Sequence, residues 1–197
     1  MFLSVRIIRI MNHNAVLALV SSAWVALELA LTIITRRSAG PSAHDRGSHA
    51  VLWALVGAAT FAAGFVRQFP FARMPQRNAM FWFGIALILI GMAIRAVAIS
   101  TLRRFFTVQV TIQQSHELVD RGIYGVIRHL SYTGVLLSFI GLGFAFGSWL
   151  SLGFILAAAW IGFVYRIRVE ETALTNHFGD RYRTYAARTK RLIPGVY

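Results

Sequence analysis

Five long apolar runs alternate with polar segments along the chain, and this pattern predicts helices that cross a membrane. The runs cover residues 15–35, 49–66, 79–102, 132–146 and 149–163. The first is 21 residues long and is interrupted only by Glu28. As a helix it would span a hydrocarbon core of about 30 Å, and it exceeds the roughly 7–15 apolar residues of a signal peptide. The sequence therefore predicts an all-α integral membrane protein with about five transmembrane helices.

The fourth and fifth runs are separated only by a Gly-Ser pair, which predicts a tight helical hairpin. Long polar segments, residues 103–131 and 165–197, flank this hairpin, and we expect the second to be helical as far as Pro194. We therefore divide the chain into N-terminal membrane helices, residues 1–102, and a core at residues 103–197 that carries the chemistry.

Charge adds an orientation to this topology. Only 14% of the residues are charged, against about 25% in soluble domains, yet the formal net charge is +13. The N-terminus and the loop at 67–78 carry five arginines, whereas the segments on the opposite side carry fourteen Lys and Arg. Basic loops are normally cytoplasmic. We therefore expect the N-terminus outside, on the non-cytoplasmic side, and the C-terminal helical segment, which would bind a cofactor, at the cytoplasmic face.

Composition also excludes several function classes. The chain has no cysteine, which excludes disulfides, thiolate metal sites and a cysteine nucleophile. The His, Asp and Glu residues show no recognisable metal-ligand spacing, so no metal is expected. The basic residues lie at helix ends and beside the predicted spans rather than on a soluble basic domain, so we expect the bilayer, not nucleic acid, as the partner.

Two polar segments could carry chemistry beside the membrane. Residues 116–134 contain two histidines, two tyrosines and two arginines, and the tail contains the adjacent carboxylates Glu170 and Glu171. Arg166 and Glu170 are four residues apart, so they share one face of a helix. An interfacial helix that binds lipid head groups is the alternative interpretation, but an anionic leaflet would repel two adjacent carboxylates.

Two ionisable residues lie inside apolar runs, Glu28 in the first and Arg95 in the third. Such groups are costly in hydrocarbon and are functional candidates by default. Pairing with each other and extension to the membrane interface are both open.

The two polar segments together resemble the isoprenylcysteine carboxyl methyltransferase family and its phospholipid methyltransferase relatives. The first segment matches the family pattern at His116, Leu118, Val119, Gly122, Tyr124, Arg128, His129, Tyr132 and Gly134. The tail matches at Arg166, Glu170, Glu171, Leu174, Phe178, Gly179, Tyr182, Tyr185, Arg191 and Pro194. The resemblance covers about residues 101–197. Leu130 replaces the family's proline, and leucine would let the following helix begin earlier and move His129.

The resemblance implies an S-adenosylmethionine-dependent methyltransferase that releases S-adenosylhomocysteine and acts on a lipophilic or lipid-modified acceptor, most simply a carboxylate of isoprenylcysteine type. It implies cofactor binding by His116, Leu118, Val119, Gly122, Tyr124, His129, Tyr132 and Glu171. Arg166 and Glu170 are the expected catalytic residues. Arg166, paired with Glu170, would orient the acceptor carboxylate, and Tyr185 and Arg191 would also contact the acceptor.

Other functions stay open at this point. A phospholipid amine or a small lipophilic amine or thiol would be an alternative acceptor, with Glu170 or Glu171 removing a proton from the amine. Membrane sterol reductases of similar topology would use NADPH instead. A non-catalytic lipid-binding membrane protein is the third alternative.

Overall fold

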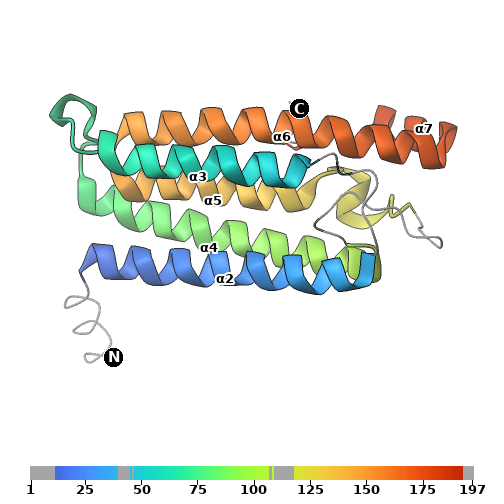
Figure 1. The fold of residues 1–197 in the computed structure, drawn as a ribbon, viewed down its shortest axis with the longest axis horizontal. Coiled ribbons are helices and arrows are strands. Elements are labelled where there is room, and N and C mark those ends of the chain that lie inside the picture. The colour runs from blue at the N-terminus through green and yellow to red at the C-terminus, as the bar shows by residue number, and fades with distance from the viewer. Residues whose placement is uncertain (1–11, 40–44, 46, 107, 109–117, 193–197) are drawn as a thin grey trace.

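The computed structural model describes residues 12–39, 45, 47–106, 108 and 118–192, and its regular elements are helical. The long helices are α2 (His13–Ala39), α3 (Ser48–Val66), α4 (Arg77–Leu102), α5 (Leu130–Phe146) and α6 (Trp149–Phe178). They lie side by side in an elongated bundle (Figure 1). Short elements are η1 (Pro70–Ala72), η2 (Arg103–Phe105), η3 (Gly122–Gly125) and α7 (Asp180–Arg188). The all-α prediction is confirmed.

Four of these helices, α2, α3, α4 and α6, are long and apolar enough to cross a membrane. The remaining predicted span, the fourth along the chain, is α5, an apolar helix of 17 residues that is shorter than a usual span of about 20 residues. The predicted hairpin is present, since Gly147 takes a left-handed conformation after α5 and the Ser148 hydroxyl caps α6. The start of α5 is two residues earlier than the apolar pattern predicts.

The tail differs from the single helix that its periodicity predicts. Helix α6 continues 15 residues beyond the apolar run and carries the acidic pair on the same rod as the membrane span. Gly179, with φ of +57°, then ends α6 and separates it from α7. The last helix stops at Arg188, so the described chain beyond it is not helical. A positive φ costs a residue with a side chain more than it costs glycine, which explains the break.

Helices α4 and α5 pack with their backbones in close contact. A Cβ atom added to Gly91 of α4 would lie 2.5 Å from the carbonyl oxygen of Gly134 on α5, and one added to Gly84 would overlap the carbonyl oxygen of Gly141. Small residues permit this approach where lipid gives helices no hydrophobic reason to associate. The contact also joins the two predicted parts of the chain in one core, because Ile88 and Phe139 belong to the same buried cluster.

Candidate active site

A cavity opens at the end of the bundle where η3, the start of α5, the second half of α6 and α7 meet. Aromatic and polar side chains from α7 and from residues 118–129 form one part of the wall, and apolar side chains of α3, α5 and α6 form another. A ligand there would contact the polar segments and the membrane helices together.

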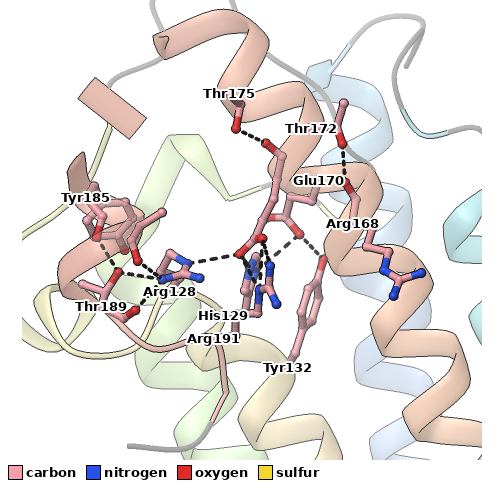
Figure 2. Close-up of polar contacts among 12 residues, drawn as sticks. Arg128, His129, Tyr132, Arg168, Glu170, Thr172, Thr175, Tyr185, Thr189 and Arg191 are labelled. Atoms are coloured by element: carbon pink, nitrogen blue, oxygen red, sulfur yellow. Dashed lines mark hydrogen bonds and ion pairs between the residues drawn. The ribbon is translucent and has the colours of Figure 1, made fainter. Parts of the chain in front are cut away.

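Figure 2 shows the centre of this site, where His129, Tyr132 and Glu170 meet. His129 is the N-cap of α5, and its ring stacks on that of Tyr132 with centroids 5.4 Å apart. The Tyr132 hydroxyl donates to Glu170 Oε2 at 2.5 Å, and His129 Nδ1 lies 3.7 Å from the same oxygen. The Glu170 side chain keeps 29% of its surface exposed, so it can meet a ligand.

The neighbouring carboxylate, Glu171, is engaged by side chains of the protein itself. It accepts from Arg128 Nε at 3.1 Å and from Arg191 at 2.8 Å, and His129 Nε2 lies 3.2 Å from Oε1. These contacts hold the chain after α7 against the segment before α5. Backbone hydrogen bonds continue the contact, since the amides of Arg128 and His129 donate to the carbonyls of Lys190 and Arg191.

Arg166 is the largest fully buried side chain of the described residues. Its guanidinium donates to Asp45 Oδ1 at 2.7 Å, to Ser48 Oγ at 2.8 Å and to the Val108 carbonyl. Its Nε donates to the Tyr132 hydroxyl at 2.9 Å, and that hydroxyl in turn donates to Glu170. The expected direct pair of Arg166 and Glu170 is therefore corrected to a bridged one, with Tyr132 between them.

Besides Tyr132, three tyrosines line the cavity: Tyr124, Tyr182 and Tyr185. The Tyr185 hydroxyl donates to the Tyr124 carbonyl at 2.8 Å, and the Tyr124 hydroxyl donates to the Ala98 carbonyl at 3.3 Å. Burial raises the pKa of Tyr185 to about 12 and raises the pKa values of Tyr124 and Tyr182 as well. All three hydroxyls therefore stay protonated near neutral pH and can act as hydrogen-bond donors.

Glu28 and Arg95 pair with each other across α2 and α4. Arg95 donates from Nη2 to Glu28 Oε2 at 2.6 Å, its Nε lies 2.6 Å from Glu28 Oε1, and its Nη1 donates to Ser131 Oγ. Both charged residues are buried and lie in the cavity wall. Of the two alternatives left open by the sequence, the ion pair is the one observed.

The same residues connect this chain to known proteins. Residues 84–176 match the model of the isoprenylcysteine carboxyl methyltransferase (ICMT) family. This part of the chain, just under half of its length, is similar to the ICMT family. The matched range includes α5, most of α4 and α6 and the site residues from Leu118 to Glu171, and four apolar helices together with this family identify an integral membrane protein.

Individual proteins named as isoprenylcysteine methyltransferases also match this chain. The chain is 34% identical over 116 residues to protein-S-isoprenylcysteine O-methyltransferase B of Arabidopsis thaliana, covering 58% of this chain and 59% of the relative. It is 26% identical over 151 residues to protein-S-isoprenylcysteine O-methyltransferase of Tribolium castaneum, covering 76% and 54%. A solved structure of the eukaryotic intramembrane Ras methyltransferase ICMT matches with a TM-score of 0.60 and 28% identity, over 73% of this chain and 52% of that one. The chain thus spans little more than half the length of these proteins.

The structure brings together most of the residues expected from the ICMT motifs. Leu118, Val119, Tyr124, His129, Tyr132, Arg166, Glu170 and Tyr185 line the cavity. Glu171 and Arg191 contact each other, with Arg191 Nη2 donating to Glu171 Oε2 at 2.8 Å, and the acceptor contact expected of Arg191 stays a prediction. Gly122 supplies a left-handed turn at the start of η3, with φ of +62°. His116 lies outside the described residues.

Several residues that line or support the site were not expected there, and three of them show why. Arg128 and Tyr182 belong to the ICMT motifs but carry no obvious role in the sequence, and the structure places both in the cavity wall. Asp45 lies in a polar loop far from either motif, and only the fold brings its carboxylate to Arg166. The motif itself was the available signal for the first two, whereas no local signal identifies Asp45.

Proposed function

We propose that this protein is a membrane-embedded, S-adenosylmethionine-dependent methyltransferase whose acceptor is a carboxylate on a lipophilic molecule of isoprenylcysteine type. The observation that carries the proposal is a continuous cavity that joins the ICMT motif residues to apolar membrane helices. Glu170 and His129 line its polar part, whereas Leu52, Trp53 and Phe163 line its apolar part. A cofactor and a lipid chain would therefore be bound side by side.

The residues present fit the cofactor. S-adenosylmethionine carries a sulfonium and an ammonium group, and Glu170 offers a partly exposed carboxylate. Aromatic faces attract such cations, and Tyr132 lies beside that carboxylate. When bound, the cofactor would supply an electrophilic methyl group for in-line transfer. Leu118, Val119 and Tyr124 would contact its uncharged parts, with His129 and Tyr132 beside the reacting end, while Gly122 and Glu171 would shape the wall. We propose cofactor binding for His116 on the family pattern alone.

The protein's contribution to the reaction would be positioning and exclusion of water. An acceptor carboxylate is already nucleophilic at neutral pH, so no residue needs to remove a proton from it. Arg166 would act as a positioning residue, because its guanidinium fixes the Tyr132 hydroxyl that orients Glu170. Tyr185, also in the wall, would border the acceptor or the cofactor. Holding the reactants in one orientation can supply roughly 7–11 kcal/mol of barrier reduction.

The proposed orientation places this cavity at the cytoplasmic face and the N-terminus outside. It rests on the fourteen Lys and Arg of one side against five on the other. A lipid-modified acceptor made in the cytosol would then reach the site from the inner leaflet.

Binding and transfer test the proposal separately. Full-length protein in lipid nanodiscs should bind radiolabelled S-adenosylmethionine saturably, with displacement by S-adenosylhomocysteine, and should methylate an S-farnesyl cysteine. His129→Ala should abolish binding, whereas His177→Ala, an exposed histidine at the end of α6, should leave it unchanged. Absence of binding by the wild-type protein would refute the proposal. Binding of NADPH in its place would identify a reductase, and methylation of amines or thiols alone would refute the acceptor class.

A further inference from the structure

Helix α7 places one buried hydroxyl in the cavity wall without a hydrogen-bond partner. Tyr182 is 2% exposed and lines the cavity, and its hydroxyl oxygen contacts no donor or acceptor among the described residues. Buried polar groups in native proteins are nearly always hydrogen-bonded, so an orphan at the wall of a ligand cavity calls for a partner. The expected partner is a ligand.

The two neighbouring tyrosines, in contrast, have partners for their hydroxyls. Tyr185 lies one turn further along α7, with its ring centroid 5.9 Å from that of Tyr182, and its hydroxyl donates to the backbone. The Tyr124 hydroxyl also donates to a backbone carbonyl. Burial and the nearby charge of Glu171 raise the pKa of Tyr182, so its hydroxyl stays protonated and can donate.

The surroundings of Tyr182 indicate what it would donate to. The ring of Tyr185 lies beside that of Tyr182, and the Tyr185 hydroxyl donates to the carbonyl of Tyr124, whose buried cluster Val119 packs against. These side chains and Leu174 of α6 line the same cavity and present aromatic and aliphatic surfaces, to which Tyr182 adds a hydroxyl donor. Such a wall suits a planar heteroaromatic ring with acceptor nitrogens and an adjoining sugar better than it suits a charged amino-acid group.

We propose that the Tyr182 hydroxyl donates a hydrogen bond to the nucleoside of the bound cofactor, and that α7 with Tyr124 and Val119 forms the nucleoside subsite. This inference rests on the proposed function, because it takes an adenosine-containing cofactor as the ligand. It also gives α7, which follows the break at Gly179, a defined role, since this helix carries Tyr182 in the cavity wall.

Tyr182→Phe provides a sharp test, because it removes only an oxygen that has no partner among the described residues of the ligand-free protein. S-adenosylhomocysteine affinity, measured by calorimetry on nanodisc-embedded protein, should fall about tenfold, the scale of one hydrogen bond. The melting temperature of the ligand-free variant should equal or exceed that of the wild type. Tyr185→Phe is the matched control, because it removes a satisfied hydroxyl and should lower the ligand-free melting temperature.

A second ligand locates the contact. 5′-Methylthioadenosine keeps the nucleoside and lacks the amino-acid group, so Tyr182→Phe should weaken its binding by the same factor. A loss seen with S-adenosylhomocysteine alone would overturn the nucleoside assignment. Equal affinities of wild type and Tyr182→Phe for S-adenosylhomocysteine would overturn the inference while leaving the proposed function intact. A wild-type protein that binds neither ligand would instead overturn the proposed function.

Discussion

The buried pair of Glu28 and Arg95 gives the sharpest prediction about stability. The Arg95 guanidinium makes three contacts of 2.6 Å, one to each carboxylate oxygen of Glu28 and one to the Ser131 hydroxyl. The side chains are only 6% and 7% exposed. Replacing Glu28 with leucine, or Arg95 with methionine, therefore leaves one charge buried without its counterion.

The size of the effect follows from this burial. Removing one partner of a buried ion pair typically costs about 3–5 kcal/mol, whereas replacing both partners with apolar residues is often nearly neutral. Each single variant should thus lose several kcal/mol of unfolding free energy, and the double variant should recover most of that loss. The coupling energy between the two sites should be at least about 3 kcal/mol.

Denaturant unfolding in lipid or mild detergent of the wild type, both single variants and the double variant measures this coupling. The pair formed by Asp180 and Arg183 serves as a control, because its contact is also short, 2.7 Å, but its side chains are 92% and 68% exposed. Coupling at that surface pair should be close to zero. Additive losses at Glu28 and Arg95 would refute the reasoning, since additivity means that the two charges do not stabilise each other.

Three further predictions concern packing, the start of α5 and pH. Gly91→Leu should lower the unfolding free energy by about 3 kcal/mol or prevent folding, because its Cβ would meet the α5 backbone. Gly153→Leu, with nothing within 4 Å of its Cβ, should melt like the wild type. Leu130→Pro should change S-adenosylhomocysteine affinity by less than about twofold, because residue 130 is the first of α5, where proline is tolerated. The pKa of Tyr185 rises from 10.0 to about 12 on folding, so unfolding free energy should fall between pH 10 and 12, and Tyr185→Phe should remove that part of the fall in pH-dependent melting curves.

The apolar pattern predicts the bundle well because lipid-facing and buried positions are both apolar. The four long helices and the hairpin follow from run length and from the Gly-Ser break. The positions of helix ends are harder to predict from the sequence, since polar residues can continue a helix without changing its period. This is why α6 extends far past its apolar run and why the effect of Gly179 is visible only in the backbone.

The site is partly predictable for a different reason. Helical spacing correctly places Arg166 and Glu170 on one face, but spacing along one helix carries no information about a side chain that arrives from another. Tyr132 comes from α5 and takes the position between them, and Asp45 comes from the segment before α3 and pairs with Arg166. The motif identifies which residues gather, whereas tertiary packing decides which of them contact each other.

The pairing of charges also bears on the choice of cofactor. Although the chain carries a net charge of +13, the three arginines that line the cavity in the described part of the chain each contact a carboxylate: Arg95 contacts Glu28, Arg128 contacts Glu171 and Arg166 contacts Asp45. A ligand with several phosphates, such as NADPH, would have to compete with these carboxylates for the guanidinium groups. A sulfonium ligand needs the opposite arrangement, an exposed carboxylate beside aromatic rings. Glu170 with Tyr132 supplies it, because the surplus positive charge of the chain is neutralised where the ligand would bind.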